Sequence, residues 1–163
     1  MKTVLALIAC LATATPALAE IKVQLLPPWT GDKIPAGQHC TLQGGNGSTP
    51  PMKVSGLPQG TAGILVEYDD KTYKPLSTKG GHGTLLYPAK AGTVTLPAVP
   101  GMTAKLPGGV RVYKKSRASG KFKSDGYLPP CSDGRNNKYT ATLMPISAQG
   151  KVLDKVQVVI GRY

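Results

Sequence analysis

Residues 139–143 read YTATL, with an aromatic or aliphatic side chain at every second position and threonine between them. This period of two is typical of a β-strand that has one face in the core and one face toward solvent. Residues 21–25 (IKVQL) and 110–113 (VRVY) alternate in the same way. Four more continuously apolar segments are predicted to be central strands: residues 62–68, 83–87, 92–96 and 152–160.

Glycine and proline interrupt the chain at short intervals. The 163 residues include 20 glycines and 15 prolines, and residues 64–74 are the longest stretch after residue 19 that contains neither. Helical bundles and doubly wound α/β folds need longer uninterrupted helices, so the sequence excludes both classes. With 40% hydrophobic residues, the chain can bury the core of one domain. We therefore predict an all-β antiparallel sheet sandwich with Greek-key character and little or no helix in the mature chain.

The N-terminus has the three parts of a secretory signal peptide. Lys2 supplies a positive charge, residues 4–11 are apolar, and residues 17–19 (ALA) form a small-residue cleavage site. The apolar run is too short to span a bilayer. We expect a cleaved signal peptide at residues 1–19, a single domain at residues 20–163, and a periplasmic or secreted protein.

The predicted signal peptide determines which of the three cysteines belong to the mature domain. Cys10 leaves with the signal peptide, or, in an alternative reading, the LIAC sequence that ends at Cys10 is a lipoprotein box and Cys10 is lipidated. Cys40 and Cys131 then remain as a pair, and an even pair in an oxidising compartment favours a disulfide. A metal site is not expected, because these cysteines and the two histidines, His39 and His82, lack metal-ligand spacing.

The charge balance is strongly basic. The formal net charge is +12, and it becomes +11 without residues 1–19, which contain Lys2 and no acidic residue. Residues 114–123 (KKSRASGKFK) alone carry five positive side chains and no acid. This segment is either a solvated loop that keeps the protein soluble or a basic lip beside an anion site, and charge does not decide between the two.

Motifs in several parts of the chain follow one another in a recognisable order. Residues 34–61 contain IP, HCT, GNGSTPPM and SGLPQGT, and residues 81–89 read GHGTLLYPA. Residues 126–132 read GYLPPCS, NKY follows at 137–139, and residues 151–163 end in VIGRY. They are similar to the IP…YTC…NxSPPL…SGxPxGT, HWVVYNIPA, GYxGPCP…HRY and closing LxGxY patterns of the phosphatidylethanolamine-binding protein family. The chain resembles in particular the bacterial Raf-kinase-inhibitor-like branch.

The resemblance implies a small surface cavity that takes anions, typically a phosphate or a phospholipid headgroup. Asp70 and His82 fall on the first Asp and the first His of the family pattern, and Asn137 stands where the second His is expected. An imidazole and the amides of a turn donate to phosphoryl oxygens, while an Asp orients the imidazole or meets the ammonium group of a ligand. By the same resemblance, the wall of the cavity is formed by Tyr127, Pro129 and Cys131.

Several family positions differ in this chain. Lys71 and Thr72 replace the Pro and second Asp of the DPD signature, Gly83 replaces the Trp after the His, and Asn137 provides a donor without a charge. Residues 145–151 are too few for the helix that the family usually places before its last strand. These differences indicate a divergent member with an altered pocket.

The candidate residues also have structural interpretations. Asp70 can cap a turn, Tyr127 can be a core aromatic residue, and Cys131 is better explained by a disulfide with Cys40 than by reactivity.

The function expected from these features is binding of a small anionic or phosphorylated ligand, such as a phospholipid headgroup, without a cofactor. An enzyme is not expected, because the sequence has no GxSxG nucleophile elbow and no glycine-rich phosphate loop. Nucleic acid is not expected as a partner, because the aromatic platforms of single-strand binders are missing. An anionic membrane surface is a further expected partner.

The alternative function is that of a basic interaction or inhibitor protein, which binds an acidic partner in the cell envelope and has a disabled pocket. The sequence does not determine the oligomeric state.

Overall fold

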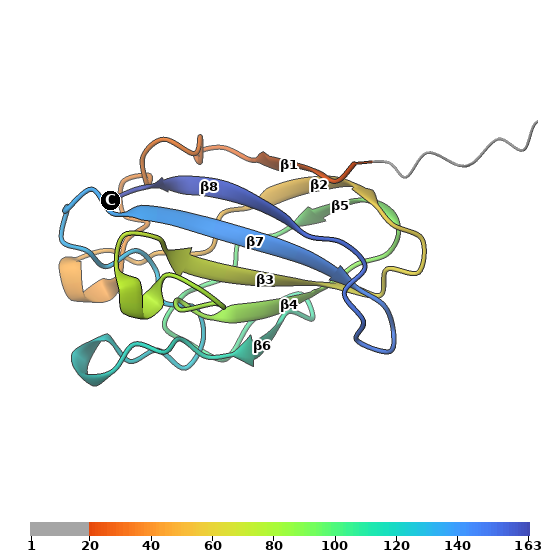
Figure 1. Ribbon diagram of the computed structural model, residues 1–163. Coiled ribbons are helices and arrows are strands. Elements are labelled where there is room, and N and C mark those ends of the chain that lie inside the picture. Colours follow the sequence, from red (N-terminus) through yellow and green to blue (C-terminus); the bar gives the residue numbers. More distant parts are fainter. Residues whose placement is uncertain (1–19) are drawn as a thin grey trace, which may run out of the picture.

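Eight antiparallel strands form two sheets in residues 20–163, the part of the chain that the computed structural model describes (Figure 1). The expected signal peptide and the Cys10 alternative lie outside the described residues. Three short 3-10 turns accompany the strands, and no helix in the described part is long and apolar enough to cross a membrane. The strands are β1 (Lys22–Leu25), β2 (Met52–Leu57), β3 (Gly63–Asp70), β4 (Thr84–Pro88), β5 (Gly92–Leu96), β6 (Arg111–Lys114), β7 (Lys138–Ile146) and β8 (Val156–Arg162).

The two sheets pack face to face as a sandwich. The small sheet has the strand order β1-β2-β5 and the large sheet has the order β6-β4-β3-β7-β8. Within the large sheet, β7-β3-β4-β6 is a Greek-key order, because β7 returns to lie beside β3 rather than beside β6. The predicted all-β sandwich with Greek-key character is confirmed.

Alternating side chains of the central strands fill the core between the sheets. Ile64, Val66 and Tyr68 of β3 point inward and are at most 1% exposed, and Ala141 and Leu143 of β7 face them from the neighbouring strand. Burial of such aliphatic and aromatic side chains contributes about 25 cal/mol per Å² of apolar surface. The alternation seen in the sequence therefore determines which face of each strand enters the core.

Strand positions follow the sequence prediction closely, with one omission. Strands were expected at seven places and occur at all seven, although β8 begins at Val156 rather than at residue 152. Val152 instead forms an isolated bridge with Ile146. Strand β2 was not predicted, because a bulge between Val54 and Leu57 interrupts its alternation.

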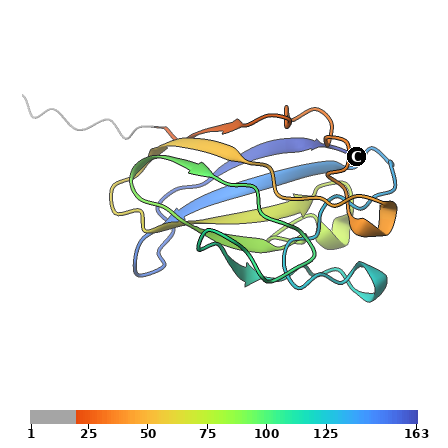
Figure 2. The same ribbon diagram turned by 180° about the vertical axis from the view of Figure 1, so that it is seen from behind.

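Loops from many parts of the chain meet at one end of the sandwich. The three 3-10 turns, η1 (Thr41–Gln43), η2 (Lys74–Leu76) and η3 (Gly120–Phe122), lie at the same end as the final residues of β8, as Figure 1 and the reverse view in Figure 2 both show. The predicted disulfide joins Cys40, next to η1, to Cys131, with a Cα–Cα distance of 5.3 Å. This end of the sandwich contains the candidate site.

Candidate functional site

Three backbone segments bring the predicted residues together at this end. Asp70 is the last residue of β3, and its Cα partner in the sheet is Tyr139 at the start of β7. Asn137 directly precedes β7, and His82 precedes β4. The hairpin of β3 and β4 and the pairing of β3 with β7 therefore place Asp70, His82 and Asn137 around one cavity.

The cavity has a volume of about 430 Å³. A buried polar floor contains Asp70, His82 and Tyr139, with Asn137 beside them. The wall includes Leu76, Leu128 and the disulfide residue Cys131, and the mouth is formed by exposed loops. The remaining lining residues are Tyr73, Pro75, Arg117, Ala118, Ser119, Lys121, Phe122, Ser132 and Arg135.

Asp70 is held by three hydrogen bonds to its carboxylate. Oδ1 accepts the backbone N–H groups of Thr72 and Tyr73 at 2.9 and 3.0 Å, which is an Asx turn after the strand. Oδ2 accepts the side-chain amide of Asn137 at 2.6 Å. The turn-capping interpretation and the ligand-site interpretation therefore both apply to Asp70, because the residue caps the turn and also lines the cavity.

His82 is only 3% exposed, and one ring nitrogen is committed to the protein. Its Nδ1 lies 2.8 Å from the carbonyl oxygen of Leu128, and a carbonyl can only accept, so Nδ1 carries the hydrogen. Burial lowers the pKa of His82 below the usual imidazole value, while the Leu128 carbonyl, Asp70 and Asp69 raise it in part. The neutral Nδ1–H tautomer is the form that this environment favours.

Tyr139 is the aromatic partner of His82 across the cavity floor. The two rings meet edge to face with centroids 5.3 Å apart. The hydroxyl of Tyr139 accepts the backbone N–H of Cys131 at 3.3 Å, and burial raises the pKa of the phenol, so Tyr139 keeps its hydrogen at neutral pH. A neutral phenol at this position can donate a hydrogen bond to a ligand oxygen.

Positive charge surrounds the mouth of the cavity. Arg117 and Lys121 come from the segment 114–123, and Arg135 comes from the loop before β7. The guanidinium of Arg117 donates to the carbonyl oxygens of Pro75 and Thr78, with Nη2–O distances of 3.1 and 2.8 Å, and to that of Lys79. Arg117 thus also fixes the η2 loop that forms one side of the mouth. The basic segment is therefore partly a lip of the cavity.

Two residues expected in the wall lie elsewhere. Tyr127 is 1% exposed and packs on Tyr68 with ring centroids 4.6 Å apart, which makes it a core aromatic residue. Pro129 is buried against Gly47 and Gly101. Neither lines the cavity; Leu128, between them, lines it and supplies the carbonyl that orients His82.

The sequence analysis also missed residues that line the cavity. Arg135 lies in the loop DGRNN (residues 133–137), between the GYLPPCS motif and Tyr139, and its distance from other basic residues in sequence concealed its position. Tyr139 was identified only as a strand residue. The signal that could have found Tyr139 is the period of two, which places it on the inward face at the strand end.

Gly83 explains why no Trp follows His82. Its φ angle is +115°, and a Cβ atom there would lie 2.8 Å from the carbonyl oxygen of Gly126. Residues with side chains rarely adopt this conformation. The backbone of residues 81–83 therefore approaches the 126–128 segment so closely that only glycine fits.

The donor set does not suit a metal ion. Among residues 20–163, no group of three or more His, Cys, Asp or Glu side chains is arranged to hold one. Both cysteines of the described part are joined in the disulfide, which removes their thiolates. The polar groups of the cavity are arranged for hydrogen bonding and for charge.

A two-sheet Greek-key sandwich of this kind, with a small cavity at one end, has the fold of the phosphatidylethanolamine-binding protein (PEBP) family. The solved structures include a similar one, the crystal structure of E. coli YbcL, described as a new member of the mammalian PEBP family. The similarity covers 89% of this chain and 98% of that chain with a TM-score of 0.56 and 18% sequence identity. No family model and no curated protein matches the sequence. The fold implied by the motifs is confirmed.

Proposed function

We propose that this protein binds a small anionic or phosphorylated ligand, such as a phospholipid headgroup, in the cavity of Asp70, His82 and Asn137. The observation that carries the proposal is that three cationic side chains, Arg117, Lys121 and Arg135, line the same cavity as these buried polar groups. Asp70 is the one acidic residue among the lining residues. A concave site with this excess of positive charge attracts anions and orients them by hydrogen bonds.

The fold is consistent with this proposal, and the ligand class is inferred from the side chains that line the cavity. Arginine presents a planar set of donors that matches phosphoryl oxygens, and the phenol of Tyr139 adds a neutral donor deeper in the cavity. Tyr73, which is 53% exposed, and Phe122 add apolar surface at the mouth. A ligand with a phosphoryl group and a short organic substituent can use both surfaces.

The proposed role is binding, without catalysis, in the periplasm or outside the cell. No serine of the nucleophile-elbow type occurs in the sequence, and His82 is oriented by a backbone carbonyl rather than by the carboxylate of a catalytic triad. The export signal proposed for residues 1–19 and the disulfide both suit an oxidising compartment.

Calorimetric titration of the purified protein with phosphate and with phosphoethanolamine tests the proposal. An intact mass recorded first identifies the N-terminus, which is Glu20 if the signal peptide is cleaved. We expect saturable binding that Arg135→Ala weakens at least about tenfold, because a charge-assisted hydrogen bond is worth about 1.5–3 kcal/mol.

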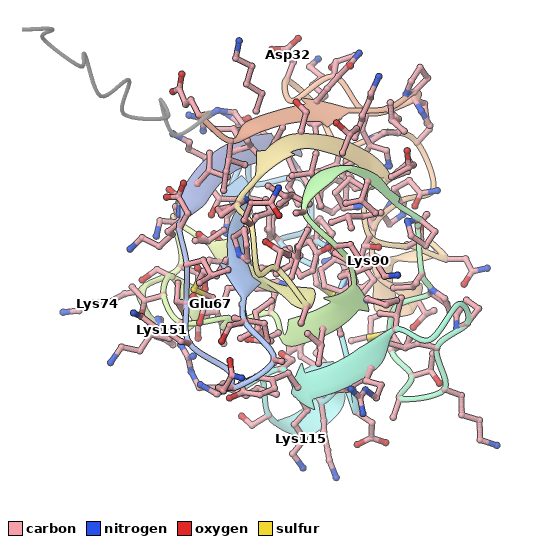
Figure 3. The ribbon with its side chains drawn as sticks, turned by 90° about the vertical axis from the view of Figure 1, so that its right-hand side faces the viewer. Asp32, Glu67, Lys74, Lys90, Lys115 and Lys151 are labelled. Atoms are coloured by element: carbon pink, nitrogen blue, oxygen red, sulfur yellow. A yellow bond between two sulfur atoms is a disulfide. The ribbon has the colours of Figure 1, made fainter. Side chains whose placement is uncertain are left out.

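Lys151→Ala is the matched control for loss of one positive charge. Lys151 is exposed in the turn between β7 and β8, which Figure 1 shows at the end of the sandwich opposite the three 3-10 turns, and its side chain is labelled in Figure 3. This variant should bind as the wild type does. Equal weakening by both substitutions, or the absence of binding in moderate salt, would contradict a specific pocket.

The alternative function is binding of an acidic envelope partner by the basic surface. Four of the five basic side chains of segment 114–123 are exposed and make no hydrogen bond to another described residue: Lys114, Lys115, Lys121 and Lys123. Binding to a polyanion that weakens steeply with salt and is unaffected by His82→Ala would favour this alternative.

A further inference from the structure

The floor of the cavity presents hydrogen-bond acceptors as well as donors. Because Nδ1 of His82 donates to Leu128, the other ring nitrogen, Nε2, carries a lone pair in the neutral form. Nε2 has no hydrogen-bond partner among residues 20–163. The sealed, unpartnered polar side-chain atoms in that range belong to Gln43, Thr84 and Thr140, so Nε2 is not sealed and is open to the cavity that His82 lines.

Asp70 provides a second acceptor beside it. Oδ1 is occupied by two backbone N–H groups, whereas Oδ2 accepts the amide of Asn137, and the phenol of Tyr139 lies near the same carboxylate. A carboxylate oxygen has about two lone-pair sites, so Oδ2 can accept one more hydrogen. The amide of Asn137 donates one hydrogen to Oδ2 and adds no positive charge, so Oδ2 remains an acceptor for a hydrogen of the ligand.

The mouth and the floor of the cavity therefore favour different chemical groups on a ligand. Arg117, Lys121 and Arg135 require negative charge, whereas His82 Nε2 and Asp70 Oδ2 require a hydrogen. A fully ionised oxyanion satisfies the cations but brings its oxygens against two lone pairs in a buried floor. An unpaired buried acceptor costs about 1–3 kcal/mol, which is enough to decide between ligands of the same shape.

We propose that the cavity selects phosphoryl ligands that carry a donor hydrogen and rejects oxyanions that carry none. This inference rests on the proposed function and specifies its ligand class. Hydrogen phosphate and protonated phosphate monoesters carry the hydrogen on the phosphoryl group, and an ethanolamine phosphodiester carries it on its ammonium group. Sulfate has the shape and charge of hydrogen phosphate but no such hydrogen, and a choline phosphodiester has the charge of the ethanolamine compound but carries three methyl groups in place of the ammonium hydrogens.

The charged groups around His82 make this selection depend on pH. Asp69 and Asp70 of β3 favour its protonation, Tyr139 of β7 is neutral, and the cations Arg117, Lys121 and Arg135 line the same cavity. When acid protonates the imidazole, Nε2 becomes a donor and a hydrogen-free oxyanion is no longer opposed there. Sulfate should therefore bind more tightly as the pH falls, and the preference for phosphate should narrow.

Competitive calorimetry of the purified protein with inorganic phosphate and sulfate, at pH 7.5 and at pH 5, tests the inference. At pH 7.5 we expect phosphate to bind at least about tenfold more tightly than sulfate. Glycerophosphoethanolamine against glycerophosphocholine is the second pair, and it distinguishes a headgroup from free phosphate as the source of the hydrogen. Preference for phosphate over sulfate supports the inference, because these two ions differ in the hydrogen and not in shape.

His82→Asn and Lys121→Ala are the matched variants. The asparagine amide can still donate to the Leu128 carbonyl but places no acceptor at the Nε2 position, so His82→Asn should reduce the preference at pH 7.5 about tenfold. Lys121→Ala should weaken phosphate and sulfate by the same factor and keep the preference. Thermal melting of both variants identifies any loss of folding.

The outcomes separate this inference from the proposed function. If phosphate and sulfate bind equally at pH 7.5 and Arg135→Ala weakens both, the anion pocket stands and the selection by hydrogen is wrong. If the wild type binds none of the four probes, the proposed function is overturned and the inference with it. An unchanged preference in folded His82→Asn would also overturn the assignment to Nε2.

Discussion

At the scale of single residues, the neighbours of a side chain decide its chemistry. His82 is one of two histidines in the sequence, and the family resemblance predicted it to line an anion cavity. The carbonyl of Leu128 now fixes its tautomer, and burial keeps it neutral. Asn137, in place of a second histidine, is tied to Asp70 and does not titrate. His82 is therefore the one imidazole that lines the cavity.

The depressed pKa of His82 predicts a loss of stability in acid. The unfolded chain has an ordinary imidazole pKa of about 6.5, so below that pH the unfolded state binds a proton that the folded state resists. The contribution of His82 is therefore complete above pH 6.5 and decreases as the pH falls toward the lower folded-state pKa. Urea unfolding of wild type and His82→Asn at pH 7.5 and pH 5 measures this. The wild type should lose more stability on acidification than the variant, and identical losses would contradict the prediction.

At the scale of elements, Asp70 connects two strands and a loop. It ends β3, caps the turn toward η2 through Thr72 and Tyr73, and holds the segment before β7 through Asn137. Arg117 fixes the far side of the η2 loop through backbone carbonyls. The mouth of the cavity is thus held from both sides by charged side chains rather than by strand pairing.

Removal of the Asp70 carboxylate should loosen this loop. Asp70→Ala leaves the amides of Thr72 and Tyr73 without their acceptor, so both should exchange with deuterium faster, and the protein should lose about 2 kcal/mol of stability. Hydrogen–deuterium exchange of residues 71–77 measures the effect. Asp32→Ala is the control, because Asp32 is exposed on another surface (Figure 3) and its carboxylate accepts no hydrogen bond from another described residue. Equal exchange in both variants would show that other contacts hold the loop.

At the scale of the whole molecule, the disulfide joins loops that are far apart in sequence. Cys40 and Cys131 are separated by 91 residues, and Cys40 is fully buried. The bond lies in a small apolar cluster with Leu76 and Leu128, next to the cavity wall. Most strands of both sheets are contained within the loop that it closes.

Loss of this bond should destabilise the entire fold. A loop of this length removes about 4–5 kcal/mol of chain entropy from the unfolded state, which is a large share of the stability of a domain of this size. The double variant Cys40→Ser, Cys131→Ser should therefore unfold at a much lower denaturant concentration than the oxidised protein. Reduced wild-type protein should behave like the double variant, and an unchanged midpoint in both would contradict the prediction.

Most of the fold could be predicted from the sequence, because its signals are local. The alternation at residues 139–143 and the frequent glycines and prolines depend only on near neighbours in the chain, and they were enough for the sandwich and for seven of its strands. Strand β2 escaped because the bulge at Gly56 breaks the period of two. The pairing of Cys40 with Cys131 was predicted from the number of cysteines and from the expectation of an oxidising compartment, and the structure contains this disulfide.

The site was decided in part by long-range packing, which local patterns do not contain. The family resemblance identified Asp70, His82 and Asn137, but the cavity charge comes from loops that only the strand order β6-β4-β3-β7 brings together. The same packing puts Tyr127 in the core and makes Leu128, its neighbour, the residue that orients His82. The sequence by itself determined seven of the eight strands, the cysteine pair and the candidate polar residues. The tertiary structure decided the cavity wall, the charge at its mouth and the tautomer at its floor, because each depends on contacts between residues far apart in the chain.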